Sequence, residues 1–153
     1  MRHMEPSNTL LPHAAPASPY RRLLLFAIRR MAAGGIADAH AAHALFTGFG
    51  IGYRRPLILL RALMAELSRV STTRLSVAPC CCARMTREEG ALLQSMALAQ
   101  TEPRAAHDEL LRLLHVRSCL GVLSSAQAVA GAFADLGMPI ESDCVSCNYD
   151  EAF

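Results

Sequence analysis

Apolar residues along this chain recur at helical spacing in several separate segments. The clearest is residues 56–70, where the apolar positions are 56, 60, 63, 64, 67 and 70. This spacing places them on one face of an α-helix, and no segment shows the convincing apolar–polar alternation of a strand. The pattern predicts an all-α fold, a single bundle of five or six helices over residues 19–33, 36–46, 56–70, 87–99, 101–120 and 124–136.

Residues with strong preferences for helix ends mark several of these boundaries. Pro19 suits the first turn of a helix. Thr86 and Glu89 have the spacing of a capping box, in which each side chain bonds the backbone amide of the other residue. Glycine just after a helix often ends it, so we expect Gly121 to end the fifth helix and Gly137 the sixth.

The chain divides into three parts by composition. Its 153 residues have the length of one domain. Residues 1–18 contain three prolines and little periodicity, which predicts a flexible N-terminal arm. The helical domain follows over residues 19–139, and residues 140–153 form an acidic C-terminal tail.

Composition favours a helical protein that folds in the cytoplasm. Apolar residues make up 52% of the chain, which excludes a disordered protein, and without Trp the core must be mainly aliphatic. The most apolar run, Leu23 to Ile28, is far shorter than the roughly 18 residues that a bilayer span needs. The N-terminus also lacks the apolar stretch and cleavage site of a signal peptide. We therefore expect a cytoplasmic protein whose cysteines stay reduced.

Charge is divided unevenly along the chain. Residues 1–74 contain ten arginines and three acidic residues, whereas residues 75–153 contain five arginines and ten acidic residues. The two halves can pair with each other. Alternatively, the basic half can bind an acidic protein, nucleic acid or an anionic membrane surface. The arginines that would form such a surface are Arg21, Arg22, Arg29, Arg30, Arg54 and Arg55.

Three consecutive thiols, Cys80, Cys81 and Cys82, are the most unusual local feature. They follow Pro79 and precede the capped helix, so we expect them in a loop. Nearby arginines and the positive end of the helix lower the pKa of a thiol, which suits a metal ligand or a redox-active group. The alternative is that these small side chains fill a tight turn against the core.

A second motif, Cys144-Val145-Ser146-Cys147, has the spacing of half a tetrahedral metal site. The other ligands could come from Cys80, Cys81 or Cys82, or from His115 and Cys119, which are four residues apart on the predicted fifth helix. Such a composite site suits zinc or an iron–sulfur cluster. Reversible thiol oxidation without a metal is the other use of this motif.

Other chemistry-bearing residues form no recognisable catalytic set. His40 and His43 are three residues apart on the second predicted helix, which is compatible with metal binding, but two surface histidines explain them as well. The glycines of residues 48–52 lack the spacing of a phosphate-binding loop. The sequence therefore favours a non-enzymatic protein, and an enzyme remains the open alternative for which no residue set argues specifically.

The stretch from Arg74 through the three cysteines to Thr86, followed by Glu88-Glu89 and Leu92-Leu93, resembles the signature of a family of short, uncharacterised bacterial proteins. The resemblance is strongest over residues 74–93. It implies a small helical protein with a thiol-bearing loop, and it implies no reaction.

Two functions follow as hypotheses, and a purely structural helical protein with neither activity is the third possibility. The first is a metal-binding or redox-sensing site made by the Cys80–Cys82 loop and the Cys144/Cys147 pair. The second is an interaction module that uses the basic N-terminal helices. Assembly into a homo-oligomer is compatible with either.

Overall fold

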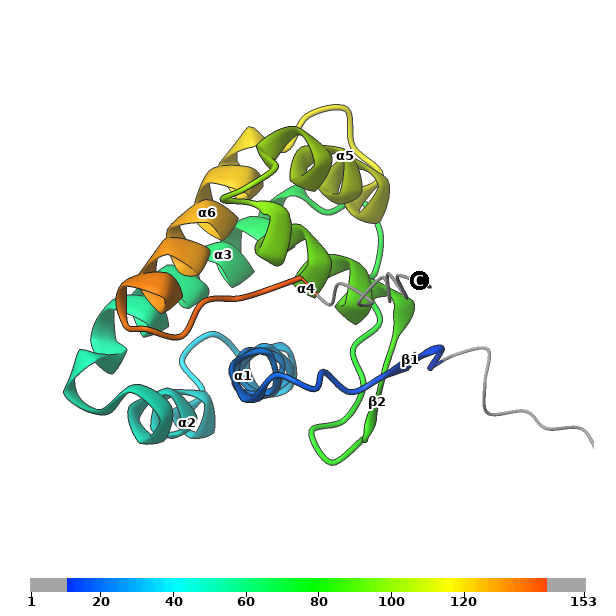
Figure 1. Ribbon diagram of the computed structural model, residues 1–153. Coiled ribbons are helices and arrows are strands. Elements are labelled where there is room, and N and C mark those ends of the chain that lie inside the picture. The colour runs from blue at the N-terminus through cyan, green and yellow to red at the C-terminus, as the bar shows by residue number, and fades with distance from the viewer. Residues whose placement is uncertain (1–10, 143–153) are drawn as a thin grey trace, which may run out of the picture.

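Six α-helices, one 3₁₀ helix and two very short strands make up residues 11–142, the part of the chain that the computed structural model describes (Figure 1). The all-α prediction is confirmed, although the small sheet was not predicted. The elements are β1 (His13–Ala14), α1 (Pro19–Gly34), α2 (Ala39–Phe49), η1 (Gly50–Tyr53), α3 (Arg54–Val70), β2 (Arg84–Met85), α4 (Arg87–Leu98), α5 (Pro103–Leu114) and α6 (Leu120–Asp135).

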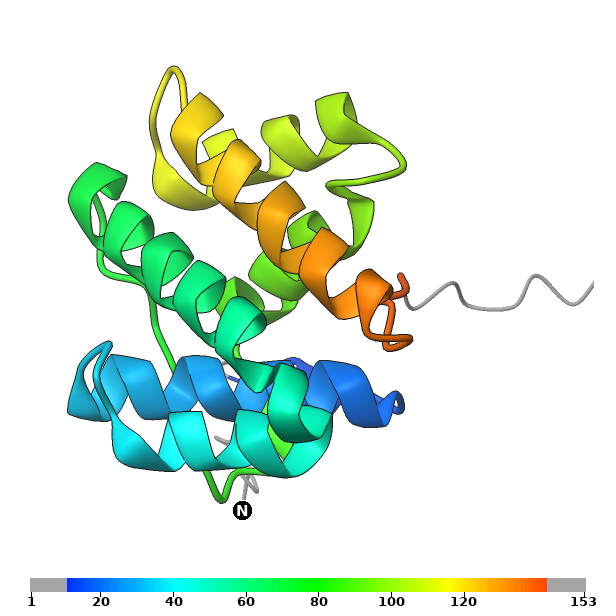
Figure 2. The same cartoon turned by 90° about the vertical axis from the view of Figure 1, so that its left-hand side faces the viewer.

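The helices pack as three pairs, α1 with α2, α3 with α6, and α4 with α5 (Figures 1 and 2). Helix α1 also contacts α3 and α4, so it joins the first pair to the other two. The long segment between α3 and α4, residues 71–86, crosses from one pair to another. It contains β2 and the three consecutive cysteines.

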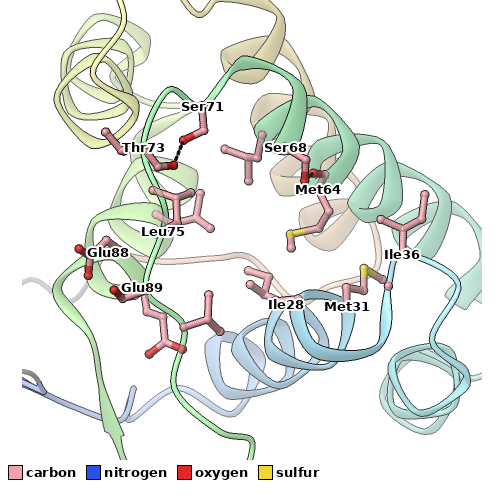
Figure 3. Close-up of a pocket in the computed structure, with 16 residues that line it drawn as sticks. Ile28, Met31, Ile36, Met64, Ser68, Ser71, Thr73, Leu75, Glu88 and Glu89 are labelled. Atoms are coloured by element: carbon pink, nitrogen blue, oxygen red, sulfur yellow. Dashed lines mark hydrogen bonds between the residues drawn. The ribbon is translucent and has the colours of Figure 1, made fainter.

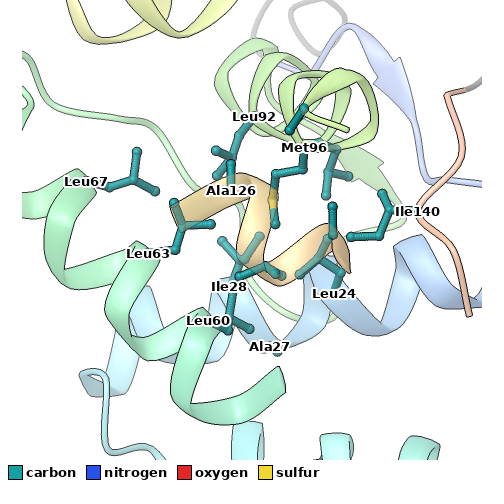
Figure 4. Close-up of a cluster of buried hydrophobic side chains, with 14 of the residues drawn as sticks. Leu24, Ala27, Ile28, Leu60, Leu63, Leu67, Leu92, Met96, Ala126 and Ile140 are labelled. Carbon is teal, nitrogen blue, oxygen red and sulfur yellow. The ribbon is translucent and has the colours of Figure 1, made fainter. Parts of the chain in front are cut away.

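Aliphatic side chains from α1, α3, α4 and α6 meet in one core (Figure 4). Four of the six positions expected from the helical spacing of α3 are buried, among them Leu60, Leu63 and Leu67, whereas Met64 and Val70 are half-buried against the same core. Leu24 and Ile28 of α1 pack on the same cluster. An aliphatic core follows from a chain without Trp, because Leu, Met and Ala supply most of its apolar surface.

The boundary between the fifth and sixth helices was predicted wrongly. Helix α5 ends at Leu114, where His115 adopts a left-handed conformation with φ of 54° and caps it. Helix α6 begins at Leu120, so Gly121 lies in its first turn. A Cβ on Gly121 would lie 2.6 Å from Oε1 of Glu66. This glycine therefore lies where α6 packs on the Glu66 side chain of α3 and does not end a helix.

Residues 11–18, within the predicted N-terminal arm, lie against the segment before α4. His13 pairs with Met85 and Ala14 with Arg84 in an antiparallel ladder. The Arg84 side chain donates to the carbonyls of Leu11 and Pro12, at 2.8 and 3.1 Å. The arm is therefore fixed to the cysteine-bearing segment from residue 11 onward.

Helix α2 begins at Ala39 and ends at Phe49, three residues later at each end than the pattern predicted. Its N-cap is Asp38, whose carboxylate accepts from the Ala41 amide at 3.0 Å and from the Arg30 guanidinium at 2.9 Å. These bonds stabilise the charged form. The hydrogen bond from Arg30, followed by that from Ala41, lowers the pKa of Asp38 from 3.8 to about 2.

This pKa shift predicts a loss of stability in acid. Because the folded-state pKa of Asp38 is lowered, its contribution is present above about pH 4 and is lost as the pH falls towards about 2. Asp38→Asn keeps a good N-cap but removes the titration, so its melting temperature should depend less on pH in that window. Thermal melts of both proteins test this, and parallel acid profiles would contradict it.

Candidate thiol site

The three cysteines lie in a tight turn at the surface. The amide of Cys82 donates to the carbonyl of Pro79 at 3.0 Å, which closes the turn over Cys80 and Cys81. The Cys81 side chain is exposed, and those of Cys80 and Cys82 are half-buried. The prediction of a thiol-bearing loop before a capped helix is thus met, and all three thiols lie at least partly open to solvent.

A buried arginine of α1 binds the backbone of this turn on the side that faces the core. The Arg29 guanidinium donates to the carbonyls of Pro79 and Cys82, at 3.2 and 2.8 Å, and to that of Arg84 at 2.8 Å. It also donates twice to the Glu89 carboxylate, at 2.7 and 2.9 Å. These five bonds use all five donor hydrogens of a guanidinium. Arginine is therefore suited to this position in a way that lysine is not.

Glu89 completes the arrangement from α4. Its Oε1 accepts from the amide of Ala78 at 3.0 Å, and its Oε2 accepts from the amide of Thr86 at 2.9 Å. The second bond belongs to the predicted capping box, which is present. The side chains of Arg29 and Glu89 are 3% and 2% exposed. We call this buried pair, with the backbone groups that it binds, the clamp; it fixes both ends of the cysteine turn.

Two guanidinium groups lie close enough to the thiols to interact with them electrostatically. The pKa of Arg29 is raised chiefly by its hydrogen bond to Glu89, with smaller contributions from Cys82 and Cys80. The pKa of Arg30 is raised chiefly by its hydrogen bond to Asp38, and Cys80 adds to this. Two cationic side chains therefore lie beside the turn, which is the kind of surrounding in which reactive cysteines are found.

The clamp arginine was assigned to a basic surface by the sequence pattern, and this was wrong. Arg29 is buried, and so is Arg21, which donates to the carbonyl of Glu141 at 2.9 Å. Arg21, Leu25 and Arg29 follow one another at intervals of four, so both arginines share a helix stripe with a core leucine. This spacing is the feature of the sequence from which the burial of both arginines could have been predicted.

The other arginines of the proposed basic surface divide into paired and exposed side chains. Arg30 pairs with Asp38 and Arg55 pairs with Asp135, whereas Arg22 and Arg54 are exposed. The Arg29–Glu89 and Arg55–Asp135 pairs both join the basic half of the chain to the acidic half. Some of the arginines of the basic half therefore pair with acidic residues of the other half within the fold.

The structure separates the candidate metal ligands that it describes. Cys119 is buried just before α6, and His115 is exposed at the end of α5, so they do not share a helix face. The α5–α6 connection and the cysteine turn lie at opposite ends of the molecule (Figure 1). Within residues 11–142, no three His, Cys, Asp or Glu side chains are grouped to hold a metal ion. Cys144 and Cys147 lie outside the described residues.

Burial gives Cys119 a different chemistry from the turn cysteines. Desolvation raises the pKa of its thiol, because the charged form would lie in the core. A protonated, buried thiol packs as a small apolar side chain. Cys119 therefore belongs to the core.

His40 and His43 lie on α2 beside a shallow apolar groove between α1 and α2 that Arg22 also lines. The Nδ1 atom of His40 is 3.1 Å from the Arg30 guanidinium and 3.8 Å from the Asp38 carboxylate. His40 therefore lies next to the ion pair of Arg30 and Asp38, and its Nδ1 atom is within hydrogen-bond distance of the Arg30 guanidinium.

Comparison with known proteins assigns the chain to a family. No curated protein and no solved structure matches it. Among the described residues, no helix has the length and apolar character to cross a membrane. The model of a family of unknown function, DUF6628, matches residues 1–136, which include the clamp and the three turn cysteines and end before Cys144. The chain is therefore a member of this family of unknown function.

Proposed function

We propose that this protein senses oxidants through the thiols of the Cys80–Cys82 turn. The observation that carries the proposal is the clamp, which fixes the turn backbone while the thiols remain accessible beside two guanidinium groups. Polar groups that are buried and fully bonded in this way hold a site in one geometry. A turn that only filled space would not need a buried ion pair beneath it.

The chemistry assigned to the turn is reversible two-electron oxidation by hydrogen peroxide. The Cys80 thiolate attacks one peroxide oxygen, a sulfur–oxygen bond forms, the oxygen–oxygen bond breaks, and hydroxide leaves. The Cys82 thiolate then attacks the sulfenic sulfur, which forms a disulfide and releases a second hydroxide. The hydroxides take up protons from solvent. A dithiol restores the reduced turn by thiol–disulfide exchange.

Oxidation would be transmitted to the helices through the clamp. Residues two apart in a turn lie near the Cα separation of about 4.4–6.8 Å that a disulfide accepts. Closing that ring reorients the carbonyls of Pro79 and Cys82, which are the two acceptors of the same Arg29 nitrogen. Weakening these bonds loosens the contact between the turn and α1.

The test uses reduced full-length protein with Cys144→Ser and Cys147→Ser, so that the tail cannot form its own disulfide. Stoichiometric hydrogen peroxide should remove two alkylatable thiols and two hydrogens of mass, with the bond mapping to Cys80 and Cys82, reversed by dithiothreitol. Cys82→Ser should instead leave a sulfenic acid that dimedone traps at Cys80. Arg30→Gln should slow the oxidation by about tenfold, because a cation is lost beside the thiolate.

Cys81→Ser and Cys119→Ser serve as matched controls, since neither residue belongs to the proposed pair. Both should form the same disulfide at the wild-type rate. If the turn thiols still alkylate fully after peroxide treatment, or if Cys82→Ser forms a different disulfide equally fast, the proposed chemistry is wrong.

A second candidate function, metal binding, is favoured by the place where the tail begins. Glu141 and Ser142 are bound by Arg21 of α1 and Gln94 of α4, each at 2.9 Å. These are the helices that supply the clamp. The distance to cover is about 12 Å, the rise of α1 from Arg21, which holds the start of the tail, to Arg29, which holds the turn. The five residues from Ser142 to Cys147 span about 17 Å when extended. They can therefore span that distance to the turn, whereas the two residues from Ser142 to Cys144 span about 7 Å.

Four thiolates at that position would suit tetrahedral zinc, or iron in a cluster. Protein purified without oxygen should then contain about one zinc per chain, or should show the visible absorption of an iron–sulfur cluster. Replacing both tail cysteines by Ser should abolish the metal, whereas Cys119→Ser should retain it. Wild-type protein that contains no metal and takes up none from a zinc buffer would exclude this function and leave the redox proposal standing.

A further inference from the structure

A cavity of about 390 Å³ opens between α1, α3, α4 and the segment that leads from α3 towards the cysteine turn (Figure 3). Its volume falls in the range of about 300–1,000 Å³ that is typical of small-molecule sites. It lies in the part of the chain that the family model matches. Neither proposed function of the thiol site makes use of it.

The walls of the cavity are mainly aliphatic. Helix α1 supplies Ile28 and Met31, and α3 supplies Met64. Figure 3 shows these side chains around the central space, with Leu75 on the facing segment and Ile36 at the end of α1. The two methionines are flexible and adapt to apolar ligands of different shape. Such a surface recognises an apolar body.

Two of the four hydroxyls in the lining, those of Ser68 and Ser71, face a ligand as acceptors. The Ser68 hydroxyl donates to the carbonyl of Met64 at 2.9 Å, and the Ser71 hydroxyl donates to that of Thr73 at 2.7 Å. Each hydroxyl already donates its only hydrogen, so each can only accept a hydrogen bond from a ligand. A ligand that reaches them must itself donate.

Two carboxylates belong to the lining, and only one is available for a ligand. Glu89 is neutralised by Arg29 and has both oxygens occupied. Glu88, at the edge of the cavity in Figure 3, forms no ion pair within residues 11–142. Arg61, beside the opposite wall, donates to the carbonyl of Ile36 and does not line the cavity. The accessible charge in the lining is therefore negative.

We propose that this cavity binds a small amphipathic molecule with an aliphatic body and a protonated amine as its head. The body occupies the space between α1 and α3. The head donates to the serine hydroxyls on the α3 side, and the charge of Glu88, which lies across the cavity from Ser68 in Figure 3, attracts it. This inference does not rest on the thiol chemistry, because none of the turn cysteines lines the cavity and Glu89 of the clamp only borders it.

Octylammonium is the probe, and octanoate, with the same chain and the opposite charge, is the matched control ligand. Titration of the full-length protein, followed by amide chemical shifts, should show saturable binding of octylammonium with shifts at residues 64–77. Octanoate should bind about tenfold more weakly, since it meets acceptors and a carboxylate. Calorimetry of the same titration gives the stoichiometry, which should be one.

Two variants separate the body of the site from its head. Ala32 is exposed in the lining, so Ala32→Phe should fill the mouth and abolish binding without unfolding the protein. Glu88→Gln should reduce the preference for octylammonium over octanoate to within about threefold. Glu102→Gln, an exposed acid that does not line the cavity, should leave that preference unchanged.

Three results would overturn the proposal. The first is that octylammonium changes no amide chemical shift up to millimolar concentration. The second is that octanoate binds as tightly as octylammonium, and the third is that a folded Ala32→Phe variant binds octylammonium as wild type does. The melting temperature of each variant, measured without ligand, establishes that it is folded.

Discussion

Glu89→Ala is expected to destabilise the protein by about 3–5 kcal/mol, because it leaves the Arg29 charge buried without its partner. The same substitution removes the acceptor of two backbone amides, those of Ala78 and Thr86. Arg29→Met should cost a similar amount, since it orphans the carboxylate and three turn carbonyls. Urea unfolding followed by circular dichroism measures both.

The pair of Arg55 and Asp135 is the matched control. Its nitrogen–oxygen distance of 2.7 Å equals that of the clamp, but its side chains are 63% and 60% exposed. Arg55→Met should therefore cost less than about 1 kcal/mol. If the two arginine substitutions cost the same, burial does not govern these pairs and the account of the clamp is wrong.

The double variant Arg29→Met with Glu89→Met separates the ion pair from its backbone partners. A buried pair that contacts only itself can often be replaced by apolar residues at no cost. Here the replacement would leave three carbonyls and two amides of the turn without partners. We therefore expect the double variant to remain less stable than wild type by at least about 2 kcal/mol. Recovery to wild-type stability would show that the turn is not held by the clamp.

Phe133→Ala is the second large expected effect, a loss of about 3–5 kcal/mol. Phe133 of α6 is fully buried, and its ring meets that of Phe49, at the end of α2, edge to face with 4.8 Å between centroids. The alanine leaves a cavity where the α1–α2 pair joins the rest of the fold. Edge-to-face contact adds a smaller stabilisation that is lost with the ring.

Phe46→Ala is the corresponding surface change. Its ring also meets an aromatic side chain edge to face, that of Tyr53 at 5.3 Å, but it is 50% exposed. We expect a cost below about 1 kcal/mol, because much of the ring is already in water. Unfolding in urea measures both variants. A loss for Phe133→Ala as small as that for Phe46→Ala would mean that the contact between Phe49 and Phe133 contributes little to the core.

Several features of the fold follow from neighbouring residues alone. The capping box of α4 depends on Thr86 and Glu89, three residues apart, and both of its bonds are present. The apolar stripe of α3 depends on a repeat within one helix, and its leucines are buried as expected. Local propensity and periodicity determine these features, so the sequence by itself was enough for helix content and much of the core.

The α5–α6 connection shows where local preferences mislead. A left-handed residue after a helix is commonly glycine, but here His115 takes that conformation and Gly121 serves close packing on Glu66. The distinction depends on α3, which is distant in sequence, so the residues around position 115 do not reveal it. The predicted pairing of His115 with Cys119 failed for this reason.

The sequence by itself determined that the chain is mainly helical and that three thiols lie in a loop before a capped helix. Only the tertiary structure showed that Arg29 is the buried partner of Glu89, 60 residues away, and that both hold that loop. It also placed the cavity beside the loop and Cys119 away from it. Helices arise from contacts between residues three or four apart, whereas buried charges and cavities depend on which distant segments pack together.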